Sequence, residues 1–174
     1  HHCSDENVHD LIDPEKCPPM LRDKSISGLI LIHHFPTELV EDLSRNFLVT
    51  SIVHDVPTAK IDHIDMDHDN GIKDLMAHLY EKGHRKIGFV GFRPQLSWAR
   101  SRLSAYLQAL IDLNLKLDQK LIYEKMDLRT LKNHQEEGVT AWLCSVDSIA
   151  YKLYRELLDE GFSIPEDLAI AGFN

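Results

Sequence analysis

Two groups of residues have side chains that commonly bind metal ions. Asp65, Asp67 and Asp69 alternate along the chain as the first ligands of a helix–loop–helix calcium site do. However, Asn70 occupies the position of that loop's glycine, and Met76 the position of its closing glutamate. The sequence also contains eleven histidines, but none of them forms an HExxH pair. Solvated loop histidines are therefore the favoured interpretation, and we predict no metal ion and no cofactor.

Signatures of enzymes are absent from the sequence. The glycines of residues 88–91 do not form a GxGxxG dinucleotide motif, and neither a GxxxxGK[ST] phosphate loop nor a GxSxG nucleophile turn occurs. Cys144 lies within an apolar run, where a structural thiol is favoured over a nucleophile. The sequence therefore predicts that the chain is not an enzyme and has no catalytic residues.

Short apolar runs alternate with stretches of helical periodicity, and this order determines where polar side chains can meet. We predict strands at residues 28–32, 48–53, 86–91, 121–124, 140–145 and 167–173. We predict helices at residues 37–46, 70–82, 97–113, 130–136 and 148–160. Because the runs are almost continuously apolar, as in strands buried on both faces, the pattern indicates an α/β fold with parallel sheets flanked by helices.

The segment between Val53 and Asn70 interrupts this alternation. It begins with a polar turn and Pro57, and it carries five aspartates before the next helix. Such a segment resembles a connection between two α/β lobes more than the turn that follows a strand. We therefore assign residues 1–67 to an N-terminal lobe with its crossover, and residues 68–174 to a C-terminal lobe.

Composition and charge restrict the class of protein. Lys and Arg number 19 against 28 Asp and Glu, and the net charge of −9 disfavours direct binding of nucleic acid by these residues. No apolar run approaches the roughly 20 residues of a membrane span, and no signal peptide is recognisable. Three widely spaced cysteines fit no disulfide framework. We therefore expect a globular protein of the cytoplasm that has no membrane partner.

Polar residues that follow the predicted strands are candidates for a binding site, because ligands of open α/β sheets bind at the carboxyl ends of strands. Arg102 lies in the first turns of a predicted helix, where the helix dipole disfavours a cation unless a polar or anionic group pairs with it. Its donors suit a carboxylate, a phosphate or neighbouring hydroxyls, and the alternative is a surface arginine paired with a nearby Asp or Glu. Trp98 either stacks on a flat or sugar-like ligand or packs on its own lobe, and Asp147 either faces the ligand or caps a helix. Arg93 and Met126 also follow predicted strands.

Four stretches of the sequence carry a family resemblance: ISGLILI, EKGHRKIGFVG, SRLSAYLQAL and VTAWLCSVDSIAYKLYRELLDEGFSIPEDLAIAGFN. In their order and spacing they resemble the effector-binding domain of lactose/galactose repressor-type transcription regulators, from about residue 25 to residue 174. The resemblance implies a two-lobed, periplasmic-binding-protein-like fold that holds a small molecule between its lobes. It also implies that the N-terminal lobe is incomplete here and that the sequence is truncated at both ends relative to the family.

The resemblance also implies roles for individual residues. Arg102 matches the arginine that contacts the effector in this family. Asn174 stands where an aspartate usually contacts the ligand, which removes a negative charge and adds amide donors. Val146 stands where sugar-binding members often have a polar residue, and Asn70 lies in a stretch that contributes to the cleft in relatives. The remaining candidates for the ligand pocket are Asp147, Trp98, Asp127 and Leu128.

The function implied by the resemblance is that of a ligand-sensing domain, which alters the affinity of a transcription regulator for its operator when an effector binds. The implied effector is a sugar, a sugar phosphate or a nucleobase-like molecule. The implied macromolecular partners are operator DNA, bound through a headpiece that this sequence lacks, and a second copy of the chain in a homodimer. A periplasmic-type solute-binding protein for transport of a sugar or related small molecule shares the fold and remains the alternative.

Overall fold

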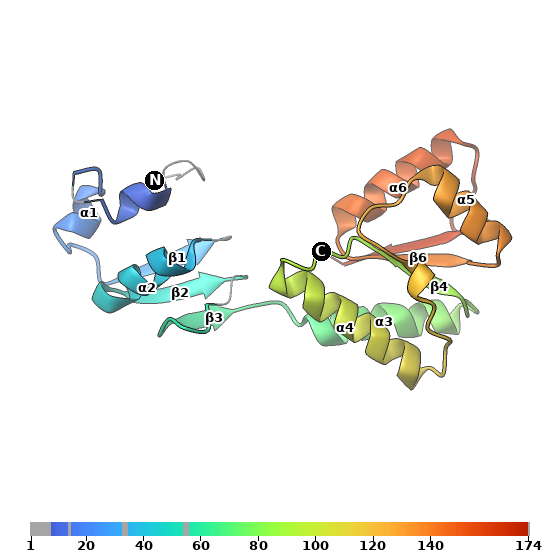
Figure 1. Ribbon diagram of the computed structural model, residues 1–174, viewed down its shortest axis with the longest axis horizontal. Coiled ribbons are helices and arrows are strands. Elements are labelled where there is room, and N and C mark those ends of the chain that lie inside the picture. The colour runs from blue at the N-terminus through green and yellow to red at the C-terminus, as the bar shows by residue number, and fades with distance from the viewer. Residues whose placement is uncertain (1–7, 14, 33–34, 54–55, 174) are drawn as a thin grey trace. The chain divides into compact units, whose positions relative to one another are not determined.

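The computed structural model describes residues 8–13, 15–32, 35–53 and 56–173 of the chain. The chain divides into two compact units, His1–Met66 and Asp67–Asn174, each with its own parallel sheet (Figure 1). This division falls beside the predicted boundary, and the interpretation of the units as two lobes around a shared ligand stays a prediction. Among the described residues, no helix is both long and apolar enough to cross a membrane.

The first unit consists of a parallel sheet in the order β1-β2-β3 with one helix packed against it. The helix α2 places Leu39, Val40 and Leu43 against the sheet, where they form a small core with Leu31 and Val49. Both β1 and α2 have the bounds that the sequence predicts. In chain order the elements of this unit are η1 (Val8–Leu11), α1 (Pro19–Arg22), β1 (Gly28–Ile32), α2 (Thr37–Asn46), β2 (Leu48–Ile52) and β3 (Asp62–Ile64).

The sequence predicts no strand in the segment that contains β3. The three residues of this strand are all exposed, and they pair with β2 in parallel register, Ile52 opposite Ile64. A short edge strand of this kind is held by backbone hydrogen bonds and buries no alternating side chains. Hydrophobic periodicity therefore could not reveal it.

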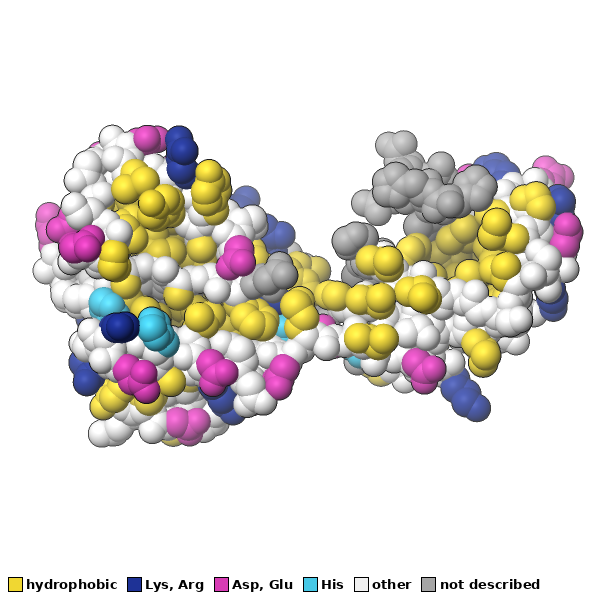
Figure 2. All heavy atoms as spheres, turned by 180° about the vertical axis from the view of Figure 1, so that it is seen from behind, with side chains coloured by type: hydrophobic (Ala, Val, Ile, Leu, Met, Phe, Trp, Pro, Cys, Tyr) yellow, Lys and Arg dark blue, Asp and Glu magenta, His cyan; other side chains and the backbone are white. Residues whose placement is uncertain are grey.

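One face of this sheet carries hydrophobic side chains that remain exposed. Ile32, Ile52 and Ile64 lie side by side in register, so their side chains point to the same face. Ile30 is 69% exposed and Leu48 is 80% exposed. Hydrophobic side chains also gather on the surface of this unit in Figure 2. Parallel sheets normally carry helices on both faces. In the first unit, no helix among the described residues covers this face.

The second unit is a parallel sheet in the order β5-β4-β6-β7 with helices on both faces. Every strand and helix that the sequence predicts in this region is present, with small shifts of the ends, and the structure confirms the α/β fold with parallel sheets. In chain order the elements are α3 (His68–Glu81), β4 (Ile87–Val90), α4 (Ser97–Asp112), η2 (Gln119–Leu121), β5 (Ile122–Tyr123), α5 (Leu128–Glu136), β6 (Ala141–Cys144), α6 (Asp147–Asp159) and β7 (Ala169–Gly172).

Two hydrophobic clusters fill the spaces between this sheet and its helices. The helices α3 and α4 contribute residues such as Met76 and Tyr106 to one cluster, and α5 and α6 contribute Leu131 and Leu157 to the other. Figure 1 shows the two pairs of helices on opposite sides of the sheet. The central strands β4 and β6 are fully buried, which explains their continuous apolar sequences. This packing holds the carboxyl ends of the strands at one edge, where the candidate site forms.

Candidate functional site

Arg102 occupies the centre of the candidate site. It lies in α4 and is only 2% exposed. Its Nε atom donates to Nδ1 of His68 at 3.2 Å, and its Nη1 atom donates to the backbone oxygens of Ser145 and, at 3.0 Å, of Phe173. Because Ser145 follows β6 and Phe173 follows β7, the guanidinium lies at the carboxyl ends of two strands. The alternative of a surface arginine is wrong, since the residue is buried, and its contact with an effector stays a prediction.

Two aromatic rings border the Arg102 guanidinium. Its central carbon lies 5.0 Å from the ring centroid of Trp98 and 4.5 Å from that of Phe173. The Phe173 ring also meets the imidazole of His68 edge-on, with 6.0 Å between the centroids. This arrangement requires Gly71, because a Cβ atom there would lie 2.2 Å from the Phe173 ring. The half-buried Trp98 thus packs against the cation, which partly offsets the cost of burying the charge.

Hydrogen bonds between neighbouring strand ends hold the edge of the sheet in place. The hydroxyl of Ser145 donates to the backbone oxygen of Gly91 at 2.8 Å, which joins the end of β6 to the end of β4. A Cβ atom on Gly91, whose φ is 99°, would lie 2.2 Å from that hydroxyl oxygen. On the same helix as Arg102, the hydroxyl of Tyr106 donates to the backbone oxygen of Ile87 at 2.8 Å. These hydrogen bonds and the packing of α4 against the sheet thus fix the position of Arg102 relative to the strand ends.

Asn70 lies on the exposed surface in the first turn of α3. Its backbone N–H donates to Oδ1 of Asp67 at 3.0 Å, and its side-chain amide donates to Oδ2 of Asp67 at 2.7 Å. These hydrogen bonds stabilise the ionised carboxylate and hold the pKa of Asp67 below its ordinary value. Asp67 thereby caps the helix, which explains why α3 begins two residues before the predicted start at residue 70.

Val146 and Asp147 open α6 directly after the end of β6. Val146 is the N-cap residue, with an extended backbone, and Asp147 is the first helical residue. The alternative that Asp147 itself caps the helix is therefore wrong. Its exposed side chain lies against β7, because a Cβ atom on Gly172 would come within 2.4 Å of the Asp147 Oδ1 atom. Val146 and Asp147 thus lie at the same edge of the sheet as Ser145, the backbone partner of Arg102.

Asp127 and Leu128 lie apart from Arg102. Asp127 caps α5 by accepting a hydrogen bond from the backbone N–H of Thr130 at 2.7 Å, and this bond lowers the pKa of its carboxyl group. Leu128 packs against the cluster beneath α5 and α6. Asp127 follows β5, and Phe173, which accepts a hydrogen bond from Arg102, follows β7. These are the two edge strands of the sheet, so three interstrand spacings of about 4.8 Å separate their ends. Asn174, the last predicted ligand residue, lies outside the described residues.

The structure therefore brings together Trp98 and Arg102 from the predicted set, and it adds three residues that are not in that set. These are His68, Ser145 and Phe173. Ser145 and Phe173 contribute backbone oxygens, whose positions carry no residue-type signal. His68 is one of three histidines in the acidic segment between Val53 and Asn70, and only the fold shows that it is buried beside Arg102.

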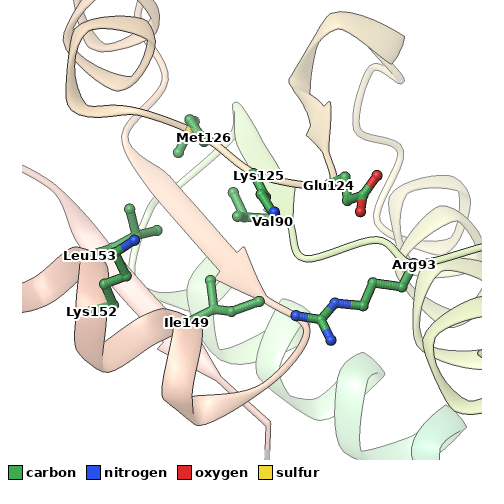
Figure 3. Close-up of a pocket in the computed structure, with 8 residues that line it drawn as sticks. All are labelled: Val90, Arg93, Glu124, Lys125, Met126, Ile149, Lys152 and Leu153. Atoms are coloured by element: carbon green, nitrogen blue, oxygen red, sulfur yellow. The ribbon is translucent and has the colours of Figure 1, made fainter.

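A cavity of about 210 Å³ opens elsewhere at the same edge of the second unit, at the carboxyl ends of β4 and β5 and beside α6 (Figure 3). None of the seven described residues of the predicted ligand set lines it, but its lining includes Arg93 and Met126, which follow predicted strands. We call it the β4–β5 pocket, and its lining residues are Val90, Arg93, Glu124, Lys125, Met126, Ile149, Lys152 and Leu153.

The described residues offer little support for metal or thiol chemistry. Among them, no three His, Cys, Asp or Glu side chains converge in a way that could hold a metal ion. Cys144 is fully buried in β6, and burial raises the pKa of its thiol to about 12. The thiol is therefore neutral near pH 7 and lacks the thiolate that a nucleophile requires.

Comparisons with known proteins give the chain a family. The family model of the periplasmic binding protein-like domain matches residues 76–174. The HTH-type transcriptional repressor PurR of Haemophilus influenzae strain PittEE is 30% identical over 174 residues, which cover 93% of this chain and 52% of that protein. Catabolite control protein A of Staphylococcus xylosus is 27% identical over 161 residues, which cover 88% of this chain and 49% of that protein. The chain thus spans about half the length of the curated relatives it matches.

Solved structures share the fold. A regulatory protein of the LacI family from Chloroflexus aggregans superimposes with a TM-score of 0.80 at 21% identity, covering 98% of this chain and 63% of that one. The transcription regulator CcpA of Lactococcus lactis superimposes with a TM-score of 0.72 at 20% identity, covering 99% of this chain and 66% of that one. These findings confirm the predicted resemblance, and the chain belongs to the family of periplasmic binding protein-like domains, with transcriptional repressors as its homologues.

Proposed function

We propose that this chain is the ligand-sensing part of a DNA-binding transcription regulator and that a small effector binds beside Arg102. The observation that carries the proposal is the buried guanidinium at the carboxyl ends of β6 and β7, in a chain whose homologues are transcriptional repressors. The rings of Trp98 and Phe173 border this cation and offer apolar surfaces to a planar or sugar-like ligand. The proposed effector is a sugar, a sugar phosphate or a nucleobase-like molecule.

Arg102 links separate elements, which gives an effector a way to change the arrangement of the protein. Its guanidinium contacts His68 at the start of α3 and the backbone after β6 and β7. A ligand group that accepts hydrogen bonds from Arg102 competes with these backbone oxygens and shifts the preference among arrangements of the three elements. Such a differential interaction is what allosteric coupling requires.

The charge of the chain supports the proposal that another part of the protein binds DNA. With a net charge of −9, these residues disfavour close approach to phosphates, so operator contacts belong to a basic headpiece. We propose that the whole protein acts in the cytoplasm as a homodimer and has no enzymatic activity. The transport alternative shares the fold, but the similarity to the transcriptional repressor PurR supports the regulator.

A ligand screen with matched variants tests the proposal. Sugars, sugar phosphates and nucleobases are screened by thermal shift against the chain, and each hit is titrated by calorimetry. The Arg102→Lys variant keeps a cation but loses the planar guanidinium with its several donors. We expect it to bind the hit about tenfold or more weakly, because the ligand loses about one charge-assisted hydrogen bond. The control is Arg129→Lys on the exposed surface of α5. Equal affinity of the wild-type chain and a folded Arg102→Lys variant would contradict the proposed site.

A further inference from the structure

The β4–β5 pocket has an apolar floor. Val90 and Leu153 are buried, with 1% and 3% exposed, and Met126 and Ile149 are partly buried against the same hydrophobic cluster. These four side chains come from β4, the loop after β5, and α6. An apolar surface inside a cavity gains free energy when a ligand displaces its water. The floor therefore favours a ligand with an apolar body.

The rim of the β4–β5 pocket is basic. Arg93, Lys125 and Lys152 line it together with a single carboxylate, that of Glu124. This grouping opposes the general charge of the chain, which is −9. Figure 3 shows the guanidinium of Arg93 extending toward Ile149, and the Glu124 carboxylate apart from it. The rim thus presents an excess of positive charge above the apolar floor.

The side chains of Arg93 and Lys125 form no ion pair with any described residue, and Lys152 has only a long contact of 3.7 Å with Glu156 on the surface of α6. Their charges are therefore available to an incoming anion. Carboxylates and phosphates are the anions that such donors bind best. The apolar floor decides between the two, because a free phosphate has no body with which to cover it.

We propose that the β4–β5 pocket binds a small carboxylate that has an apolar body. A volume of about 210 Å³ corresponds to roughly seven water molecules at about 30 Å³ each, which suits an aromatic or branched monocarboxylate of metabolite size. The carboxylate lies at the rim near Arg93 and Lys125, and the apolar body covers Ile149 and Leu153. This site goes beyond the proposed function, because the contacts of Arg102 described above, His68, Trp98, Ser145 and Phe173, do not line it.

Three probes of graded chemistry test the proposal on the full chain. Benzoate has both charge and an apolar ring, benzamide has the ring without the charge, and inorganic phosphate has the charge without the ring. Binding is followed by calorimetry and by the NMR signals of the methyl groups of Met126, Ile149 and Leu153. We expect the shifts of these methyl signals to give a dissociation constant for benzoate that is at least about fivefold lower than that for benzamide. A difference of this order is expected when a carboxylate pairs with exposed cations. Phosphate should leave them unchanged.

Charge-removing variants locate the binding. Arg93→Gln and Lys125→Gln each should weaken benzoate binding up to about fivefold, since single exposed ion pairs contribute modestly, and the double variant should weaken it about tenfold or more. Both residues are exposed, so the fold should persist, which circular dichroism checks. Lys116→Gln, at another exposed position, is the matched control and should leave the affinity unchanged.

Several outcomes would overturn the proposal. Equal binding of benzoate and benzamide would show that the cations play no part. An equal effect of Lys116→Gln would reduce the interaction to general charge. Shifts at Trp98 in place of the pocket methyl groups would place benzoate beside Arg102, which would refute the pocket while supporting an anion site of the proposed function. By contrast, weaker benzoate binding in Arg93→Gln with unchanged benzoate binding in Arg102→Lys would support a pocket that is separate from the Arg102 site.

Discussion

The backbone oxygen of Phe173 accepts a hydrogen bond of 3.0 Å from Nη1 of Arg102, and the ring of the same Phe173 lies 4.5 Å from the guanidinium carbon. One residue at the end of β7 therefore contacts the buried cation through both its backbone and its side chain. A change in the position of β7 must alter both contacts together. This double contact makes Phe173 the most direct link between the strand end and α4.

Replacing Gly71 with alanine should displace the Phe173 ring. The added Cβ atom would lie 2.2 Å from the ring, so the ring must move away from Arg102 and His68. Alanine is the better helix former by about 1 kcal/mol, but overpacking costs about 1–3 kcal/mol, and we expect net destabilisation of about 1 kcal/mol. Urea denaturation measures the change. The control is Asp74→Ala, at an exposed position of the same helix. A gain in stability for Gly71→Ala would show that the Phe173 ring moves without cost.

Removing the hydroxyl of Ser145 should loosen the link between the ends of β6 and β4. The Ser145→Ala variant loses the 2.8 Å hydrogen bond to the backbone oxygen of Gly91, and both groups are buried. Loss of a buried hydrogen bond costs about 1–2 kcal/mol. Chemical denaturation of this variant is compared with that of Ser148→Ala, which changes an exposed serine in the first turn of α6. A similar small effect of both variants would mean that the Ser145 hydroxyl does not stabilise the strand ends.

The Asn70→Ala variant should raise the pKa of Asp67 toward the ordinary value of 3.8, because the side-chain hydrogen bond from Asn70 is the largest cause of its lowered pKa. NMR titration of the Asp67 carboxyl carbon measures the shift. Asp127 is an internal control, since the backbone N–H of Thr130 lowers its pKa and remains in the variant.

The same substitution should change the acid sensitivity of the chain. A pKa that is lower in the folded state stabilises the fold above the unfolded pKa, and this stabilisation disappears as the pH falls through the folded pKa. The wild-type chain should therefore lose more stability than Asn70→Ala when the pH falls below about 3.8. Identical pH profiles of the two proteins would contradict the assigned cause.

Cys144 should resist alkylation in the native protein. With a pKa of about 12, its thiol is ionised in roughly one molecule in ten thousand at pH 8, and the side chain is fully buried. The partly buried Cys17 should react with iodoacetamide first, and Cys144 should react only after unfolding. Peptide mass spectrometry before and after denaturation distinguishes the two. Labelling of both residues at similar rates in the native state would show that β6 opens readily.

The elements of the second unit could be predicted because its strands are buried on both faces. The runs that became β4 and β6 are apolar throughout, and the helix α4, which follows β4, has a buried stripe that includes Ala105 and Tyr106. The first residues of the helices were less predictable, because they depend on capping side chains such as Asp67 and Asp127, which only their hydrogen bonds identify. The strand β3 was missed because its residues are all exposed.

The site was predictable only in part. Arg102 could be identified from its position in the first turns of a helix and from the family resemblance, but two of its hydrogen-bond partners are backbone oxygens. Burial of His68 beside it depends on the packing of α3 against α4, which no local pattern reveals. The β4–β5 pocket was missed because its lysines are ordinary exposed residues until the loop after β5 and the helix α6 bring them together.

The face of the first unit's sheet that no described residue covers has a consequence for how the chain responds to temperature. Water that surrounds Ile30, Leu48 and Ile64 is released when an apolar molecule covers them, and this gain is entropic near room temperature. Adhesion at this face should therefore strengthen on gentle warming and weaken in the cold. A fluorescent dye that prefers apolar surfaces would report this as a signal that rises with temperature well before the helices melt.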